Sequence, residues 1–460
     1  MNIFENISNI YFTGIGGIGM SALARYFLGG GFTVGGYDRT RTELCSALID
    51  EGCDIVFDDD PGLIRTHFRD KGNTVLITTP AIPPSNNILS WFRENGYKIY
   101  KRAEILGEIS KQSNTIAIAG THGKTSVSTL TAHLMKQSSA DCSAFLGGIS
   151  LNYNTNMLSG KGNITVIEAD EFDRSFHYLQ PYLSAITSID PDHLDVYGNY
   201  DNLLEAFNHF ATLTRRDGSI LINSRIRNKI RKSGNIRLFT YGLDNESDFR
   251  IENLRIEEGA YNFDFISPFG RISDLKSFIP GKLNLENSIA AIGLAVVAGA
   301  GDFEIRKALL YYRGVKRRFD VRFDRAGVTY IDDYAHHPAE LEYFIESVKE
   351  FYGKRRITLI FQPHLYSRTR DHAAAFGKML ARADSVVLLP VYPARELPIE
   401  GVTSEIIAER MTGADCRLMN MEDIPGYLKQ ADIDILLTVG AGDIDTLVRP
   451  IENLLKERLK

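Results

Sequence analysis

A short glycine loop with one lysine is the segment best suited to bind a triphosphate. GTHGKT spans Gly120 to Thr125, directly after an apolar run at residues 115–119 and directly before a helical pattern. It is a shorter relative of the GxxxxGKS/T loop, because Ile118 stands in place of the first glycine. Backbone N–H groups at a helix start hold phosphate oxygens, Lys124 reaches the β- and γ-phosphates, and the Thr125 hydroxyl can coordinate Mg²⁺. The loop therefore predicts a site for a nucleoside triphosphate and a divalent cation.

Acidic residues follow a strand that we expect beside this loop. The run ITVIE ends in Glu168, with Asp170 and Glu171 directly after it, and the run LSAITSID leads to His193. Acids at the carboxyl end of a strand next to a phosphate loop supply the hard oxygen ligands that Mg²⁺ prefers. A histidine is an unusual Mg²⁺ ligand, and a lone histidine more often has a structural role. These residues alone therefore leave the role of His193 open.

A second glycine loop, GIGGIG, stands near the start of the chain. Gly14, Gly16 and Gly19 have the spacing of a dinucleotide fingerprint between a strand and a helix, and Asp38 ends the next strand. Glycine lets a pyrophosphate approach backbone N–H groups, and the carboxylate can bind ribose hydroxyls. These residues also fit an NAD-dependent oxidoreductase, but that class of enzyme gives the loop at 120–125 no role. A nucleotide switch without catalytic activity is a third possibility.

Composition and charge exclude several classes of protein. The chain has 460 residues, 44% hydrophobic and 24% charged, which fits about three globular domains. Lys and Arg number 52 against 58 Asp and Glu, so no basic field attracts nucleic acid or anionic lipid. The longest apolar stretch, Ile289 to Gly301, is too short to span a bilayer. Four scattered cysteines indicate neither a disulfide framework nor a zinc site, so we expect a soluble, unprocessed protein of the reducing cytoplasm.

The order of the elements predicts an α/β protein with three domains. Apolar runs alternate with helical patterns in residues 1–107, 108–313 and 314–460, as in parallel sheets with connecting helices. In the middle domain, short strands with polar turns at residues 235–279 predict a small β-rich part, and a buried helix follows from Leu285 to Gly299. Each glycine loop then joins a strand to a helix.

Six segments in this order, behind the sequence GIGGIGMS, closely resemble the Mur ligases. They are GTHGKT, EADEFD, DPDHLD, GVKRRFD, DDYAHHP and FQPHLYSRTRD, and they cover all three predicted domains. The resemblance implies a Rossmann-like N-terminal domain, a central P-loop ATPase domain and a Rossmann-like C-terminal domain. It also implies an ATP- and Mg²⁺-dependent ligase of peptidoglycan synthesis. GIGGIGMS is most similar to the branch that joins L-alanine to the lactyl carboxylate of UDP-N-acetylmuramate. The binding partners would be UDP-N-acetylmuramate, L-alanine and ATP, with no nucleic acid and no membrane. We expect the protein to be a monomer or a homodimer.

The resemblance assigns a role to residues of each domain. The UDP-sugar would bind at Gly14, Gly16, Gly17, Gly19 and Asp38. ATP would bind at Gly120, Thr121, His122, Gly123, Lys124, Thr125, Ser126, Asn284, Asn287 and Arg318. The Mg²⁺ ligands would be Thr125, Glu168 and His193, and the amino-acid pocket would contain Tyr334, His336, His364 and Arg368. The catalytic residues would be Lys124, Arg318, His336 and His364, where either histidine takes the amine proton or both only bind the substrate.

Two positions differ from the family pattern. Leu283 replaces a histidine of the usual GxHNxxN sequence near the adenine, which reads GKLNLEN here. Leu365 replaces an arginine of QPHRY near the substrate, so either Arg368 or Arg370 has to carry more of the carboxylate recognition, and we expect it to be Arg368. The nearest alternative is a ligase of the same family that adds a preformed peptide to the same sugar nucleotide. Because three ligands would bind to three domains, we expect closure of the C-terminal domain to assemble the site.

Overall fold

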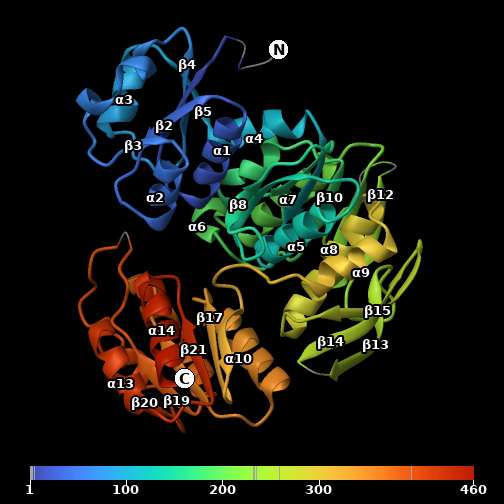
Figure 1. Ribbon diagram of the computed structural model, residues 1–460, viewed down its shortest axis with the longest axis vertical. Coiled ribbons are helices and arrows are strands. Elements are labelled where there is room, and N and C mark those ends of the chain that lie inside the picture. Colours follow the sequence, from blue (N-terminus) through green and yellow to red (C-terminus); the bar gives the residue numbers. More distant parts are fainter. Residues whose placement is uncertain are drawn as a thin grey trace. The chain divides into compact units, whose positions relative to one another are not determined.

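The chain divides into two compact units in the computed structural model (Figure 1). The structure describes residues 4, 6–231, 234, 236–257, 259–394 and 396–459, without the side chains of residues 194 and 195. One unit comprises Met1–Arg255, Asn262–Lys276 and Glu286–Arg313, and the other comprises Ile256–Tyr261, Ser277–Leu285 and Gly314–Lys460. Within the described residues, no helix has the length and apolar character needed to cross a membrane.

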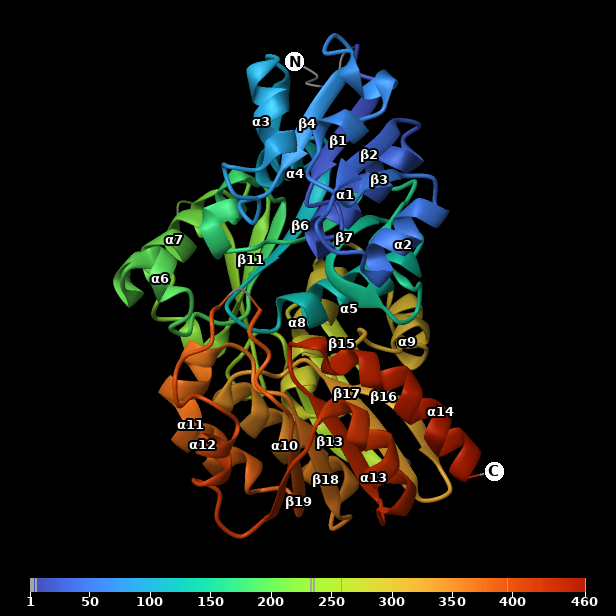
Figure 2. The same ribbon diagram turned by 90° about the vertical axis from the view of Figure 1, so that its left-hand side faces the viewer.

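The first sheet belongs to the first unit and is entirely parallel, with the order β3-β2-β1-β4-β5. Its strands are β1 (Asn9–Thr13), β2 (Thr33–Tyr37), β3 (Asp54–Val56), β4 (Thr74–Thr78) and β5 (Lys98–Lys101). Ile10 and Phe12 pack into one core and Tyr11 into another, because both faces of the sheet are covered. The helices, drawn in blue and cyan with these strands in Figure 2, are α1 (Ile18–Gly29), α2 (Glu43–Asp50), α3 (Asn87–Glu94), α4 (Arg102–Ser110), η1 (Pro61–Leu63) and η2 (Thr66–Arg69).

The second sheet carries the GTHGKT loop and has the order β12-β11-β10-β6-β9-β7-β8. It is parallel except for β8, which is antiparallel to β7. Its strands are β6 (Asn114–Ala119), β7 (Ser143–Ser150), β8 (Thr155–Leu158), β9 (Ile164–Glu168), β10 (Leu183–Ile186), β11 (Ser219–Asn223) and β12 (Arg237–Tyr241). The accompanying helices are α5 (Lys124–Lys136), η3 (Phe172–Tyr178), α6 (Leu194–Tyr197), α7 (Tyr200–Thr212) and η4 (Ser224–Ile226).

The predicted β-rich part is a three-stranded sheet followed by a long helix. The sheet has the order β13-β14-β15, with β13 (Arg250–Glu257), β14 (Ala260–Ser267) and β15 (Gly270–Ser277). The apolar helix α8 (Lys282–Val297) starts three residues earlier than its apolar run predicts, and α9 (Asp302–Leu310) follows. Most of α8 from Leu285 onward is buried, as the small residues Ala290, Ala291 and Ala295 permit.

The third sheet lies in the second unit and has the order β16-β17-β21-β18-β19-β20. It is parallel except for β16, which is antiparallel to β17. Its strands are β16 (Asp320–Arg325), β17 (Val328–Asp333), β18 (Ile357–Phe361), β19 (Ser385–Leu388), β20 (Asp415–Leu418) and β21 (Ile435–Val439). Its helices are α10 (Pro338–Tyr352), α11 (Tyr366–Leu380), α12 (Glu405–Ala408), η5 (Met421–Asp423), α13 (Ile424–Gln430), η6 (Asp443–Leu447) and α14 (Val448–Arg458).

The predicted α/β class with mainly parallel sheets and a small β-rich part is confirmed. The predicted domain boundaries at 107 and 313 stay predictions, and the first of them falls inside α4. Four strands of the first and third sheets lie outside the apolar runs from which the sequence predicts strands. They are β3, β5, β16 and β20. All four are edge strands with few buried side chains, so they lack the apolar pattern of an interior strand.

Candidate active site

The nucleotide loop is a tight turn between β6 and α5 in which two glycines leave no room for a side chain. A Cβ on Gly120, whose φ is +140°, would lie 1.9 Å from Thr187 Oγ1. A Cβ on Gly123, whose φ is +83°, would lie 2.7 Å from Asn287 Oδ1. Asn287, one of the two asparagines predicted to bind ATP, therefore lies against the loop. The loop leads directly into the first turn of α5, where backbone N–H groups have no partner within the helix and can bind phosphate oxygens.

Lys124, the first residue of α5, is held by the buried carboxylate of Glu171. Its Nζ donates to Gly120 O at 2.6 Å and to Glu171 Oε1 at 2.8 Å, and Glu171 is completely buried. Burial by itself would lower the pKa of Lys124, but the carboxylates of Glu171, Glu168 and Asp170 outweigh that effect and raise it. The lysine therefore stays charged inside the loop, as a phosphate-binding cation must.

The segment after β10 fixes the loop from the other side. The hydroxyls of Thr121 and Ser188 lie 2.9 Å apart, and Ser188 Oγ also accepts a hydrogen bond from His122 N at 2.8 Å. Asp190 N donates to Thr121 Oγ1 at 3.0 Å. The sequence reasoning missed Ser188, since a serine inside an apolar strand pattern carries no signal of its partner. Its contacts position the first half of the loop.

The predicted magnesium ligands gather beside the nucleotide loop. Thr125 Oγ1 donates to Glu168 Oε1 at 3.1 Å, and Glu168 Oε2 accepts from Gly147 N at 3.0 Å. His193 Nε2 lies 3.8 Å from Glu171 Oε1, so it approaches the carboxylate that binds Lys124. The described residues contain no group of three or more His, Cys, Asp or Glu side chains able to hold a metal. A hydroxyl and a carboxylate in contact fit an Mg²⁺ ion that also binds phosphate and water.

The N-terminal glycine loop is closed by Asp38. Asp38 Oδ2 accepts from Gly16 N at 2.9 Å, and its Oδ1 accepts from Thr40 N at 3.0 Å. A Cβ on Gly16 would lie 2.4 Å from Cys45 Sγ, so this glycine is required by packing. Gly14 has φ +82°, and Gly17 precedes the first residue of α1. The carboxylate thus orders the loop through backbone N–H groups, and its contact with a ribose stays a prediction.

The four residues predicted to form the amino-acid pocket lie together at the carboxyl ends of β17 and β18. The rings of Tyr334 and His336 are 5.3 Å apart, and those of His336 and His364 are 6.0 Å apart. Arg368, in the first turn of α11, has Nη1 3.4 Å from His364 Nδ1. Tyr392 stacks on His364 at 5.8 Å and was missed, because it comes from the loop after β19. The parallel sheet brings these segments to one edge.

Two arginines flank Tyr334. The guanidinium carbons of Arg317 and Arg318 each lie 5.2 Å from its ring centre. Arg317 is anchored, since its Nε donates to Asp332 Oδ2 at 3.3 Å and its side chain is 13% exposed. Arg317 and Phe319 both have positive φ, so the backbone around Arg318 is held in a conformation that L-residues rarely adopt. Sequence reasoning identified Arg318 and missed the anchoring role of Arg317.

The histidines of this cluster are kept neutral. Burial, together with the neighbouring His336 and Arg368, lowers the pKa of His364 to about 4. Burial also lowers the pKa of His336, although Glu340 opposes this effect. His336 Nδ1 lies 3.0 Å from Tyr334 O. At neutral pH each imidazole can therefore accept a proton or a hydrogen bond.

Asn284 and Leu365 lie in the second unit. Asn284 Nδ2 donates to Pro280 O at 2.7 Å, which places it at the start of α8. Leu365 has φ +71° and precedes the first residue of α11.

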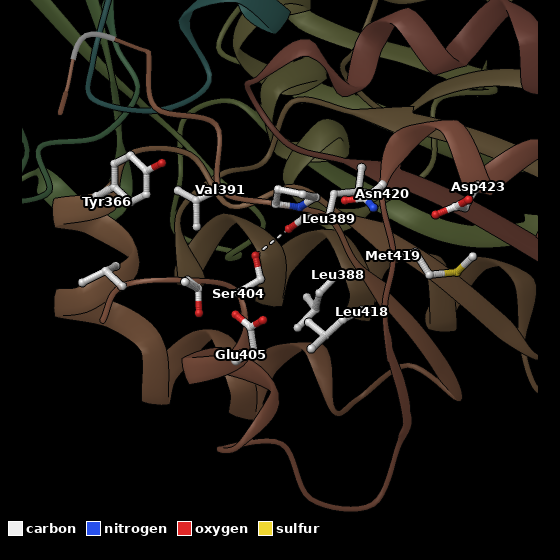
Figure 3. A pocket seen from close by; sticks show the side chains of 13 residues that line it. Tyr366, Leu388, Leu389, Val391, Ser404, Glu405, Leu418, Met419, Asn420 and Asp423 are labelled. Atoms are coloured by element: carbon white, nitrogen blue, oxygen red, sulfur yellow. Dashed lines mark hydrogen bonds between the residues drawn. The ribbon is translucent and has the colours of Figure 1, made fainter. Parts of the chain in front are cut away.

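A separate cavity of about 600 Å³ lies at the carboxyl ends of β19 and β20 (Figure 3). Its walls are as polar as they are apolar, with Leu388, Leu389 and Val391 beside Thr403 and Glu405. Ser404 Oγ, at its centre in Figure 3, donates to Leu389 O. None of the residues predicted to act on a substrate lines this cavity.

Three family descriptions match successive parts of the chain. They are the Mur ligase family catalytic domain over residues 9–114, the Mur ligase middle domain over 118–295 and the Mur ligase glutamate ligase domain over 317–442. The chain is 46% identical to a UDP-N-acetylmuramate--L-alanine ligase of Parabacteroides distasonis over 99% of each protein. It is 42% identical to the protein of that name from Flavobacterium johnsoniae over the full length of both.

Solved structures have the same fold. The UDP-N-acetylmuramate-alanine ligase MurC from Thermotoga maritima superimposes with a TM-score of 0.82 at 26% identity, over 98% of this chain and 99% of that one. A murein peptide ligase from Psychrobacter arcticus has a TM-score of 0.69 at 20% identity, over 97% and 98% of the two chains, and shares the fold. From full-length relatives, three matched domains and the site geometry, we conclude that this chain belongs to the Mur ligase family.

Proposed function

We propose that this protein joins L-alanine to the lactyl carboxylate of UDP-N-acetylmuramate, with conversion of ATP to ADP and phosphate. Relatives that carry this activity in their names are up to 46% identical over nearly the whole chain. The observation that carries the proposal is the charged Lys124 held inside the glycine loop by Gly120 and Glu171. An oxidoreductase has no use for such a lysine, so this class of enzyme is abandoned.

The first chemical task is activation of a carboxylate, because an amine cannot displace an oxide ion. Attack of the lactyl carboxylate on the γ-phosphate of ATP gives an acyl phosphate and ADP. We assign Lys124 and Arg318 to the charge on the transferring phosphoryl group, a task of electrostatics and positioning. Thr125, Glu168 and His193 would hold Mg²⁺, which supplies further positive charge to the phosphates when it is bound.

The second task is attack by the amine of L-alanine on the acyl phosphate, with loss of phosphate. The amine must be neutral to attack, so a proton must leave it. Burial lowers the pKa of both His336 and His364, so each imidazole has an unprotonated nitrogen at neutral pH that can accept a hydrogen bond or, as a weak base, the amine proton. We assign Arg368 to the carboxylate of alanine, because Leu365 has no charge at the neighbouring position.

The remaining assignments follow the same scheme. We place the diphosphate of the UDP-sugar at the loop of Gly14, Gly16, Gly17 and Gly19, with Asp38 beneath it, and the nucleotide at residues 120–126 with Asn284 and Asn287. We place the domain boundaries at 107 and 313. The four cysteines are free, which supports a cytoplasmic protein. A monomer or homodimer stays our prediction for the oligomeric state.

The test is phosphate release with ATP, Mg²⁺ and UDP-N-acetylmuramate across a panel of amino acids and a tripeptide. We expect release with L-alanine and none with UDP-N-acetylglucosamine, which lacks the lactyl carboxylate.

Lys124→Ala should lower kcat by about 100-fold or more, since it removes a positive charge from beside the phosphoryl group. Lys136→Ala, at the other end of α5, is the matched control and should stay within about twofold. Preference for the tripeptide would favour the peptide-adding ligase, and equal activity of the Lys124 variant would refute the proposal.

A further inference from the structure

Arg102 lies between the N-terminal glycine loop and the acidic segment after β9. It is the first residue of α4, and its Nη2 donates to Asp170 Oδ2 at 2.9 Å. A Cβ on Gly19 would lie 2.6 Å from Arg102 Nη1 and 3.2 Å from its Cζ. The guanidinium therefore packs directly on the first turn of α1, and its side chain is 18% exposed. Any side chain at position 19 would therefore displace the guanidinium from this place.

Asp170 connects Arg102 to the nucleotide site. It stands between Glu168, which binds Thr125, and Glu171, which binds Lys124. Its Oδ1 accepts from Phe172 N at 3.1 Å, and its carbonyl accepts from Phe176 N at 2.9 Å. Asp170 thus fixes the backbone of the segment that carries both carboxylates. Arg102 is attached to this segment from the sugar-nucleotide side.

Two helix dipoles and two carboxylates act on Arg102. A cation in the first turn of α4 and beside the first turn of α1 faces the positive ends of two helix dipoles, and Glu104 in the first turn of α4 offsets part of this cost. Asp170 offsets part of this cost and is the only hydrogen-bond partner of the guanidinium within the described residues. Nε and Nη1 therefore keep donors for a second anion, and a planar guanidinium can bind two anions at once.

We infer that Arg102 is a positioning residue that couples the two ligand sites. This inference rests on the proposed function. Nη1 and Nε bind the diphosphate of UDP-N-acetylmuramate at the start of α1, while Nη2 keeps Asp170 and its neighbours in place for the Mg²⁺ nucleotide. Binding of either ligand then improves binding of the other, by the same factor in both directions.

A second set of contacts of α1 does not involve the acidic segment and allows the ion pair of Arg102 and Asp170 to be tested separately. α1 also packs on the β7–β8 hairpin, where Asn156 Nδ2 donates to Ile18 O at 2.6 Å and to Ser21 Oγ at 3.0 Å. Arg25, near the other end of α1, donates to Asn156 Oδ1 and pairs with Glu51 at 2.8 Å. Arg25 therefore joins the same two sheets without touching the acidic segment, which makes it the matched control.

The experiment is calorimetric titration of the full chain with Mg²⁺ and AMP-PNP, with and without saturating UDP-N-acetylmuramate. We expect the sugar nucleotide to tighten AMP-PNP binding at least about fivefold in the parent protein. Arg102→Lys keeps a point charge but loses the fork, and Asp170→Asn loses the ion pair, so both should reduce this factor below about twofold. Arg25→Lys should keep the parent factor.

Two further readouts separate positioning from simple loss of structure. Asp170→Asn should bind UDP-N-acetylmuramate alone within about twofold of the parent, while Arg102→Lys should bind it more weakly. The double variant should lose no more coupling than either single one, because both changes break one connection. Unchanged coupling in Asp170→Asn overturns the inference alone, provided that both ligands bind. Failure of the parent protein to bind UDP-N-acetylmuramate instead overturns the proposed function.

Discussion

At the level of single residues, the two clusters use burial in opposite ways. Around Lys124, three carboxylates overcome the effect of burial and keep the ammonium charged. Around His364, burial and the neighbouring Arg368 act in the same direction and keep the imidazole neutral. A phosphate-binding residue needs a permanent charge, and a proton acceptor needs an available, unprotonated lone pair at working pH. Each cluster therefore has the protonation state that its proposed role requires.

His364 should titrate far below an ordinary histidine. Its pKa of about 4 lies below the ordinary value of 6.5, so the neutral form is favoured in the folded protein. The stability that this gives is fully present above pH 6.5 and is lost as the pH falls towards 4. A histidine-selective NMR titration should give a midpoint near 4. His364→Gln should flatten the pH dependence of the free energy of unfolding between pH 4 and 6.5, and a midpoint near 6.5 would contradict this account.

A histidine that acts as the base should contribute a titration step to the pH dependence of kcat. If His336 or His364 takes the amine proton, replacing that histidine by Asn should remove a step from the pH dependence of kcat. The profiles of both Asn variants are measured with saturating substrates and compared with the parent. If neither profile changes shape, both histidines only bind the substrate.

At the level of elements, the nucleotide loop depends on close approach of backbone to side chains from other strands. Gly120 combines a positive φ with a Cβ position 1.9 Å from Thr187 Oγ1, so any side chain is excluded twice. Thr187 also donates to the carbonyl of His122, so it is fixed in place. The loop is therefore shaped by the segment that follows β10 as much as by its own residues.

Gly120→Ala should cost more stability than Gly299→Ala. Gly299 also has a positive φ, of +96°, but nothing lies within 4 Å of its Cβ position. The change at Gly299 should cost only the backbone strain, about 1 kcal/mol, and the change at Gly120 should cost at least about 2 kcal/mol more. Urea unfolding of both variants measures the difference. Equal losses would mean that the loop relaxes around the added methyl group.

At the level of the whole molecule, the proposed reaction draws on both compact units. Lys124, Thr125 and Glu168 belong to the first unit, and Arg318, His336 and Arg368 belong to the second. Because Lys124 and Arg318 are both assigned to one phosphoryl group, we expect the C-terminal domain to close when the nucleotide binds. Such closure would also exclude water from the acyl phosphate.

Small-angle scattering should detect this closure. We expect the radius of gyration to fall when AMP-PNP, Mg²⁺ and UDP-N-acetylmuramate are added together, since the proposed phosphate site takes Lys124 from one unit and Arg318 from the other. Arg318→Ala should reduce the change, because it removes the side chain that we propose to bind the γ-phosphate. Identical curves with and without the ligands would count against closure.

The sequence by itself determined the parts of this protein that are contiguous in the chain. The GTHGKT loop, the interior strands and the family motifs are local patterns, and they predict the fold class, the phosphate site and the C-terminal cluster. Tertiary structure alone decided which distant groups complete them. Ser188, Arg317, Tyr392 and the pair of Arg102 with Asp170 act through partners from other strands and helices. Such pairings depend on the strand order and register, which a local pattern of residues does not specify.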